Sequence, residues 1–188
     1  METSTITRCG WCGNDKLYQD YHDEEWGQVV TDDRVLFEFL VLESAQAGLS
    51  WITILRKREN YRRLFAGFDP EKIVKFTDED VEEILKDAGI IRNRLKVRST
   101  ITNAQIFLAI QKEYGSFYKY LYSFMPNNEP IINHFTSLSE VPAATPISDA
   151  IAKDLKKRGV KFFGTTICYA YMQAVGMVND HVTSCSFR

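Results

Sequence analysis

Residues 78–97, DEDVEEILKDAGIIRNRLKV, predict two helices joined by a tight turn. Thr77 followed three residues later by Asp80 is a capping-box signature for the start of the first helix. Gly89 is expected to stop that helix, and a longer helix is expected from Ile91 onward. One apolar stripe of the first helix comprises Val81, Ile84, Leu85 and Ala88.

This stretch is a candidate helix-hairpin-helix, a motif that aims backbone N–H groups at a phosphate while nearby cations add charge. Such contacts do not read base sequence, so they predict a non-specific grip on DNA. The residues expected to contact DNA here are Gly89, Arg92, Arg94 and Lys96. Only Gly89 stands in the turn, whereas the usual motif has two glycines, so a purely structural helical hairpin is the alternative.

Outside this stretch the pattern is helical nearly throughout, which predicts an all-α fold. The acidic pair Asp32–Asp33 opens an amphipathic helix that Gly48 ends or bends. Pro146 suits the first turn of a helix ending near Gly159, while residues 125–146 are expected to be irregular. Further helices are expected at 51–65 and 165–175, and the sequence shows no repeat and no convincing βαβ alternation.

The composition is that of an ordinary globular protein, with 45% hydrophobic and 26% charged residues in 188. This length allows one domain or two intimate lobes. Because the sequence has no run of 18 apolar residues, no membrane span is expected. Residues 1–7 have neither the basic nor the apolar region of a signal peptide. Four cysteines without such a signal predict the reducing cytoplasm, where a bound metal is expected rather than disulfides.

The net charge of −2 hides a clustering of basic residues. Residues 56–63, 92–98 and 153–161 each carry a charge of +4 and together hold 14 of the 23 lysines and arginines. Basic clusters on a nearly neutral protein suit an enzyme that contacts a phosphate backbone and then releases it. The alternative is three solvated helix faces.

Two half-sites at opposite ends of the chain have the residue types of a metal site. Cys9 and His22 are separated by 12 residues, and His181 and Cys185 by three. Two thiolates and two imidazoles complete the tetrahedral shell that zinc prefers, and such a site would join the two ends of the chain. There are two alternatives. The cysteines are ordinary buried residues, or Cys9 and Cys12 form a Cys-x-x-Cys pair that is redox-active or supplies two ligands by itself.

An acid and several aromatic residues form a second candidate site. The aromatic residues are Trp11, Tyr18, Tyr21 and Trp26. Glu43 beside such rings would make a cage for a flat cationic group, because π-faces attract the charge and the carboxylate pairs with it. Small residues around Gly48 permit close backbone approach, and Leu49 is expected to project from this bend. The alternative is a set of core aromatics with Glu43 in solvent.

Eight motifs occur in order along the chain. They are RCGW (8–11), YHDEEWG (21–27), LESAQAGLSW (42–51), KRENY (57–61), DAGIIR (87–92), KKRG (156–159), FGTTICY (163–169) and VNDHV (178–182). Together they closely resemble the bacterial 3-methyladenine DNA glycosylase I family. The resemblance implies one all-α helix-hairpin-helix glycosylase domain over residues 1–188. It also implies a zinc lobe from about 1–30 and 160–188, and a helical DNA-binding lobe with its hairpin at about 78–98.

The resemblance also implies roles for particular residues. The family's structural zinc ligands fall on Cys9, His22, His181 and Cys185, which leaves Cys12 as an extra thiol. Its catalytic and base-binding acid falls on Glu43. The residues that shape the base pocket fall on Trp51, Tyr18 and Tyr21, with weaker matches at Trp11 and Trp26. Leu49 matches the position where an apolar side chain fills the gap left by a flipped nucleotide. Asp180 is not assigned as a general base and is expected to shape the zinc segment.

The activity implied is hydrolysis of the N-glycosidic bond of 3-methyladenine in alkylated double-stranded DNA, which releases the free base and leaves an abasic site. Methylation at N3 makes the base a cationic, good leaving group, so selective binding and electrostatics suffice. No lysine is an evident Schiff-base nucleophile, so no strand cleavage is expected. The protein is expected to act as a monomer and away from membranes. A DNA-binding module without catalysis and a redox protein are the rival functions.

Overall fold

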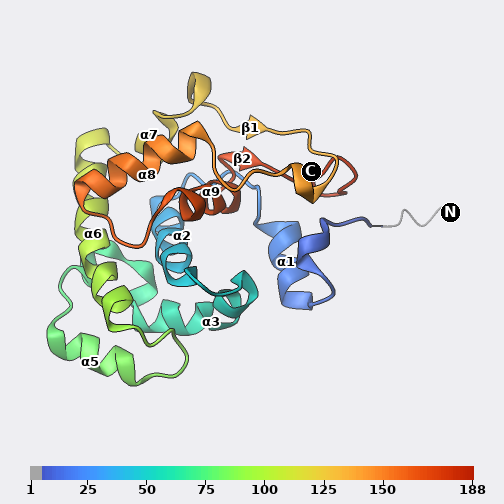
Figure 1. Cartoon of the computed structure of the whole chain (residues 1–188). Helices are drawn as coiled ribbons and strands as arrows, with labels where there is room; N and C mark the ends of the chain where they lie inside the picture. The colour runs from blue at the N-terminus through green and yellow to red at the C-terminus, as the bar shows by residue number, and fades with distance from the viewer. Residues whose placement is uncertain (1–5) are drawn as a thin grey trace.

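The computed structural model describes residues 6–188, and its helices surround one central helix, α2 (Asp33–Gln46). This helix contacts α3 (Trp51–Leu64), α6 (Arg94–Tyr114), α7 (Phe117–Tyr122) and α9 (Thr165–Ala174) (Figure 1). Every residue from Leu36 to Ala45 is buried. The prediction that this helix is amphipathic is therefore wrong, because neighbouring helices cover all its sides.

The predicted hairpin consists of α5 (Asp78–Lys86) and α6. Its capping box is confirmed, since Thr77 and Asp80 exchange hydrogen bonds between side chain and backbone. The first helix ends at Lys86, two residues before the end that Gly89 predicts, and α6 begins at Arg94, three residues after the predicted Ile91. Ala88 lies beyond α5 and is exposed, so it does not belong to the apolar stripe.

Side chains account for the longer turn. The Asp87 carboxylate accepts a hydrogen bond from the Gly89 N–H at 2.7 Å. The Ile91 N–H donates to the Tyr61 hydroxyl at 3.2 Å. These contacts give turn N–H groups partners outside a helix, so neither helix has to extend further.

The other predicted helices are confirmed, with α8 (Pro146–Arg158) ending before Gly159 at φ +103°. Residues 125–146 are mostly irregular, as expected. The sequence did not indicate the parallel pairing of β1 (Ile131–Ile132) with β2 (Val178–Asn179), because two-residue strands carry no periodicity. The remaining elements are α1 (Lys16–Glu24), α4 (Pro70–Ile73) and short 3-10 turns at Gly10–Cys12, Ala66–Phe68, Pro126–Asn128 and Leu138–Glu140.

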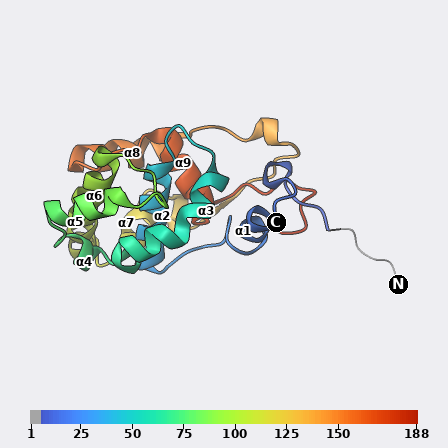
Figure 2. The same cartoon turned by 90° about the horizontal axis from the view of Figure 1, so that it is seen from below.

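The two ends of the described chain lie together at one end of the helical body, where α1 is beside the C-terminal residues (Figures 1 and 2). Thr7 and Ser186 exchange two hydrogen bonds, of 2.8 and 3.0 Å. Within residues 6–188, no helix has the length and apolar character needed to cross a membrane. Most of the segment tested for a signal peptide, residues 1–5, lies outside the described residues. The division into a zinc lobe and a DNA-binding lobe stays a prediction.

The connection from α1 to α2 packs directly against the end of α9. The Gly27 N–H donates to the Gln173 carbonyl at 2.9 Å, and the Val30 N–H to the Val175 carbonyl at 3.0 Å. Gly176 has φ +71°, and a Cβ there would lie 2.3 Å from the backbone carbonyl of Gln28. A side chain at this position would therefore force the connection away from α9.

We predict that Gly176→Ala lowers the free energy of unfolding by more than about 2 kcal/mol, because it adds left-handed strain to a clash with backbone. Gly164→Ala is the matched control, since a Cβ there meets no atom within 4 Å and φ is −77°. Gly164→Ala should lower the free energy of unfolding by less than about 1 kcal/mol. Urea denaturation measures both values, and equal losses would refute the argument.

Candidate functional site

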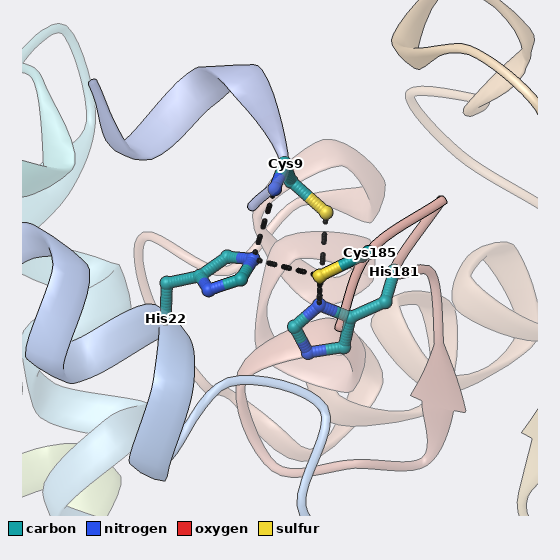
Figure 3. Close-up of side chains that lie close together, drawn as sticks. All are labelled: Cys9, His22, His181 and Cys185. Atoms are coloured by element: carbon teal, nitrogen blue, oxygen red, sulfur yellow. Dashed lines mark hydrogen bonds between the residues drawn. The ribbon is translucent and has the colours of Figure 1, made fainter. Parts of the chain in front are cut away.

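Cys9, His22, His181 and Cys185 are buried and meet in one cluster (Figure 3). Their ligand atoms all lie within 4.8 Å of one another. The Cys185 sulfur is 3.3 Å from His181 Nδ1 and 3.5 Å from His22 Nε2, and the Cys9 sulfur is 3.6 Å from His181 Nδ1. A tetrahedral zinc site places sulfur and nitrogen ligands roughly 3.5 Å apart. The four side chains are therefore arranged as the ligands of a metal site would be.

The surrounding hydrogen bonds select which nitrogen of each imidazole faces the thiols. His22 Nδ1 lies 2.8 Å from the Asp23 carboxylate, which leaves Nε2 for a metal. Arg8 in turn binds Asp23 through two guanidinium nitrogens at 2.7–2.9 Å. His181 Nε2 lies 3.0 Å from the Trp26 carbonyl, which leaves Nδ1 for a metal. Partners of this kind orient histidine ligands in metal sites.

The electrostatics of the cysteines argue against a redox pair. Burial, together with the neighbouring Cys185, raises the pKa of Cys9 to about 12. Burial also raises the pKa of Cys12, whose thiol donates to the Cys9 carbonyl at 3.2 Å and lies outside the cluster. A reactive Cys-x-x-Cys thiol needs a lowered pKa, so this alternative is not supported. A divalent cation, by contrast, would stabilise the thiolates of the cluster.

A cavity of about 380 Å³ lies between the N-terminal segment and the helical body. The predicted pocket residues Trp11, Tyr18, Tyr21, Trp26, Glu43 and Trp51 all line it. The Trp11 ring centroid is 5.0 Å from those of both Tyr18 and Trp26. The Tyr21 and Trp51 centroids are 5.6 Å apart. The structure thus brings an acid and five aromatic rings around one space.

Three residues that line this cavity each have a buried polar atom without a hydrogen-bond partner within residues 6–188: Glu43 Oε2, Trp11 Nε1 and Trp51 Nε1. Buried polar atoms are nearly always paired, so three unpaired atoms on residues around one cavity point to a ligand site there. Glu43 is only 2% exposed, which contradicts the alternative of a solvated helix residue. Burial raises the pKa of Glu43 to about 8, because no cation lies close enough to stabilise its charge.

The sequence did not indicate several residues that complete the cavity wall. They are Gln46, Leu138, Val141, Pro142, Ala170 and Gln173. Residues 138–142 belong to an irregular segment, which carries no periodic signal of burial. Gln46 and Gln173 lie on helices, where a glutamine is equally compatible with solvent.

Two of the residues expected to contact DNA, Leu49 and Lys96, differ in their exposure to solvent. Leu49 is 39% exposed, as expected for a residue that projects from the bend. Lys96 does not extend into solvent: its ammonium group donates to the carbonyls of Ala45 at 3.0 Å and Ala47 at 3.1 Å. It therefore supports the turn that carries Leu49.

The other expected contacts are arranged as follows. Arg94 forms an ion pair with Glu82, whereas Arg92 is exposed. A Cβ at Gly89 would lie 2.5 Å from the Asn60 side chain, so this glycine lets the turn approach α3 closely.

Ion pairs within the fold account for much of the basic run at 56–63. Arg58 contacts Glu38 at 2.5 Å and Glu25 at 2.8 Å. Arg62 contacts Glu38 at 2.8 Å. Arg56 and Arg63 pair with the carboxylates of Asp15 and Asp87. Carboxylates of the same chain thus balance much of the positive charge of residues 56–63.

Comparison with known proteins gives consistent matches over nearly the whole chain. The family model described as methyladenine glycosylase matches residues 11–188. DNA-3-methyladenine glycosylase 1 of Escherichia coli K12 is 53% identical over 180 residues, which cover 96% of each chain. DNA-3-methyladenine glycosylase of Haemophilus influenzae is 47% identical over 95% of this chain and 96% of that one. A crystal structure of a 3-methyladenine DNA glycosylase I variant in complex with 3-methyladenine superposes with a TM-score of 0.92 at 34% identity, covering 96% of this chain and 97% of that one.

We predict that Cys185→Ser loses bound metal and melts at a lower temperature, because one ligand of the cluster is gone. Cys12→Ser is the matched control, since Cys12 is buried beside the cluster but outside it. It should retain metal in full. Metal analysis of the purified proteins together with calorimetry tests both, and full retention of metal in Cys185→Ser would contradict the assigned ligand set.

Proposed function

This chain belongs to the methyladenine glycosylase family, and we propose that it removes 3-methyladenine from DNA with the cavity around Glu43. The activity is that of a DNA-3-methyladenine glycosylase I, a hydrolase. The C1′–N bond breaks with its electron pair on the base and water adds at C1′ of the deoxyribose, so the products are neutral free 3-methyladenine, an abasic site and one proton. The observation that carries the assignment of the cavity is its three orphaned polar atoms among aromatic rings.

The charge of the substrate explains how the cavity selects it. The N3-methylated adenine in DNA is cationic, so aromatic faces and an adjacent carboxylate attract it, while neutral adenine gains less. The raised pKa of Glu43, about 8, means that its carboxyl group is mostly protonated at neutral pH before the base enters. A bound cation favours the ionised form, so base binding is coupled to release of a proton from Glu43.

Departure of the base needs no general acid in this case. The positive charge weakens the glycosidic bond, so the base can leave without first being protonated. Glu43 contributes as the negative group that stabilises the cationic base in its extruded position. Asp180 remains outside this step, because it does not line the cavity.

The damaged nucleotide must leave the duplex to reach the cavity. Leu49, exposed on the turn after α2, is suited to fill the gap in the base stack. The two carbonyl contacts of Lys96 hold this turn in place. The backbone around Gly89 and the exposed Arg92 would contact phosphate without reading sequence. Double-stranded DNA with alkylated bases is thus the proposed partner of a monomeric enzyme.

The cavity lining supports a glycosylase that does not cleave the strand. Strand cleavage by this class of enzyme needs an amine that attacks C1′ and forms a Schiff base. Among the described residues, those that line the cavity include no lysine. Water is therefore the proposed nucleophile.

We assign the metal as zinc, with a structural role. Two cysteines and two histidines are a typical structural zinc donor set, and all four tetrahedral positions are filled by protein. No position remains for a catalytic water. A bound zinc ion would supply no chemistry to the reaction and would join α1 to the C-terminal segment.

Release of free base from alkylated duplex DNA tests the function directly. The enzyme should release 3-methyladenine and leave intact strands that break only on later treatment with alkali. A DNA-binding module would bind the same DNA tightly and release no base. That second result would refute the proposal.

We predict that Glu43→Gln weakens binding of free 3-methyladenine at least about tenfold, because the amide cannot replace the hydrogen bond between the carboxyl group and the base. Its affinity for undamaged duplex DNA should not change, since Glu43 is buried in the cavity. Calorimetric titration with the base, and a separate titration with DNA, measure the two effects. Unchanged affinity for the base would remove Glu43 from the proposed role.

We also predict that Glu43→Gln melts above the wild type by a margin that grows between about pH 5 and pH 8. The carboxyl pKa rises from 4.5 to about 8 on folding, so its neutral form stabilises the fold fully below 4.5. This contribution is lost as the pH rises toward 8, and glutamine does not undergo this loss. Glu24→Gln, an exposed position on α1, is the control and should show no such trend. A margin independent of pH would contradict the burial argument.

A further inference from the structure

Asp180 is a fully buried acid with no role in the mechanism above. Its carboxylate accepts three hydrogen bonds from neutral donors. The Tyr169 hydroxyl donates at 2.5 Å and Gln173 Nε2 at 2.9 Å, both to Oδ2, while Asn133 Nδ2 donates to Oδ1 at 2.7 Å. Of these three donors, Gln173 also lines the base cavity.

The bond to Asp180 fixes which end of the Gln173 amide faces the cavity. A carboxylate can only accept hydrogen bonds, so the amide nitrogen must point toward Asp180. The carbonyl oxygen is then the polar atom left for the cavity. Turning the amide over would lose this bond and bring two oxygens together. The backbone of Gln173 is also fixed, because its carbonyl accepts from the Gly27 N–H at 2.9 Å.

An acceptor in this position can help to separate two purines that charge alone cannot separate. Both 3-methyladenine and 3-methylguanine are cationic in DNA, so the aromatic rings and Glu43 attract both. They differ at C6, where adenine has an amino donor and guanine has a carbonyl acceptor. A buried acceptor that faces another acceptor leaves both unpaired, which strongly disfavours binding.

We infer that Gln173 determines specificity by presenting its carbonyl oxygen to the amino group of the flipped base, and that Asp180 is the positioning residue that enforces this orientation. The inference rests on the proposed function. Asp180 was expected only to shape the segment that carries the metal ligand His181. The inference adds a second role, because its carboxylate also holds Gln173, a residue of the cavity wall. Asp180 itself does not line the cavity, so it acts through Gln173.

The test is the ratio of kcat/KM for release of 3-methyladenine to that for 3-methylguanine from alkylated duplex DNA. Gln173→Met removes the acceptor, and Asp180→Asn lets the Gln173 amide turn over. Each should lower the ratio at least about tenfold. Tyr169→Phe is the matched control, because it removes another donor to the same carboxylate oxygen and leaves Gln173 in place. Its ratio should equal that of the wild type.

A purely structural role would lower both kcat/KM values together and leave the ratio unchanged, and this result in Gln173→Met would overturn the inference. Metal content and melting temperature are measured for each variant, because Asp180 is next to His181. If Asp180→Asn does not fold, the comparison of Gln173→Met with Tyr169→Phe still shows whether Gln173 determines the specificity ratio. A wild-type enzyme that releases no 3-methyladenine would refute the proposed function itself, whereas normal release with an unchanged ratio in Gln173→Met would refute only the inference.

Discussion

The joining of the two chain ends at the cluster of Cys9, His22, His181 and Cys185 is the constraint on which the base cavity depends. One wall of the cavity comes from the N-terminal segment, with Trp11, Tyr18, Tyr21 and Trp26. The opposite wall comes from α2, α3 and α9. His22 lies on α1 between the aromatic residues, and its ring centroid is 5.2 Å from that of Trp11. Fixing His22 therefore also fixes the aromatic wall.

The cavity keeps polar groups that the fold itself does not satisfy. Glu43 is buried without a cation, and the indole N–H groups of Trp11 and Trp51 lack partners within residues 6–188. Such groups destabilise the folded state, and natural proteins tolerate them mainly at functional sites. A flat cationic base supplies the missing charge and the missing surface together. In the proposed function, the same features that weaken the fold select the damaged base.

Local signals made much of the fold predictable. The capping box at Thr77, Pro146 at a helix start and Gly159 after a helix end each depend on neighbouring residues, and each marked its element correctly. The spacing of cysteines and histidines indicated the metal cluster because few residue types bind zinc. An acid that follows a series of aromatic residues, and the resemblance to a family, indicated Glu43; the structure places it in the same cavity as those rings, while its role stays a prediction.

Contacts between distant residues could not be predicted in the same way. The central position of α2 arises from helices that follow it in the chain, so its own pattern indicated one apolar face. The length of the hairpin turn depends on Asp87 and on Tyr61 of α3. The Gln173 amide is oriented by Asp180, and the Lys96 ammonium group is held by carbonyls some 50 residues away in sequence. None of these long-range contacts produces a periodic pattern in the amino-acid sequence.

The central claim is that metal at the chain ends holds the aromatic wall of the base cavity against Glu43. Removal of the metal with a chelator, followed by titration with free 3-methyladenine, tests this claim most directly. We expect affinity for the base to fall at least about tenfold while circular dichroism retains most of the helical signal, because α2, α3 and α6 have their own core. Unchanged affinity for the base in the metal-free protein would contradict the account.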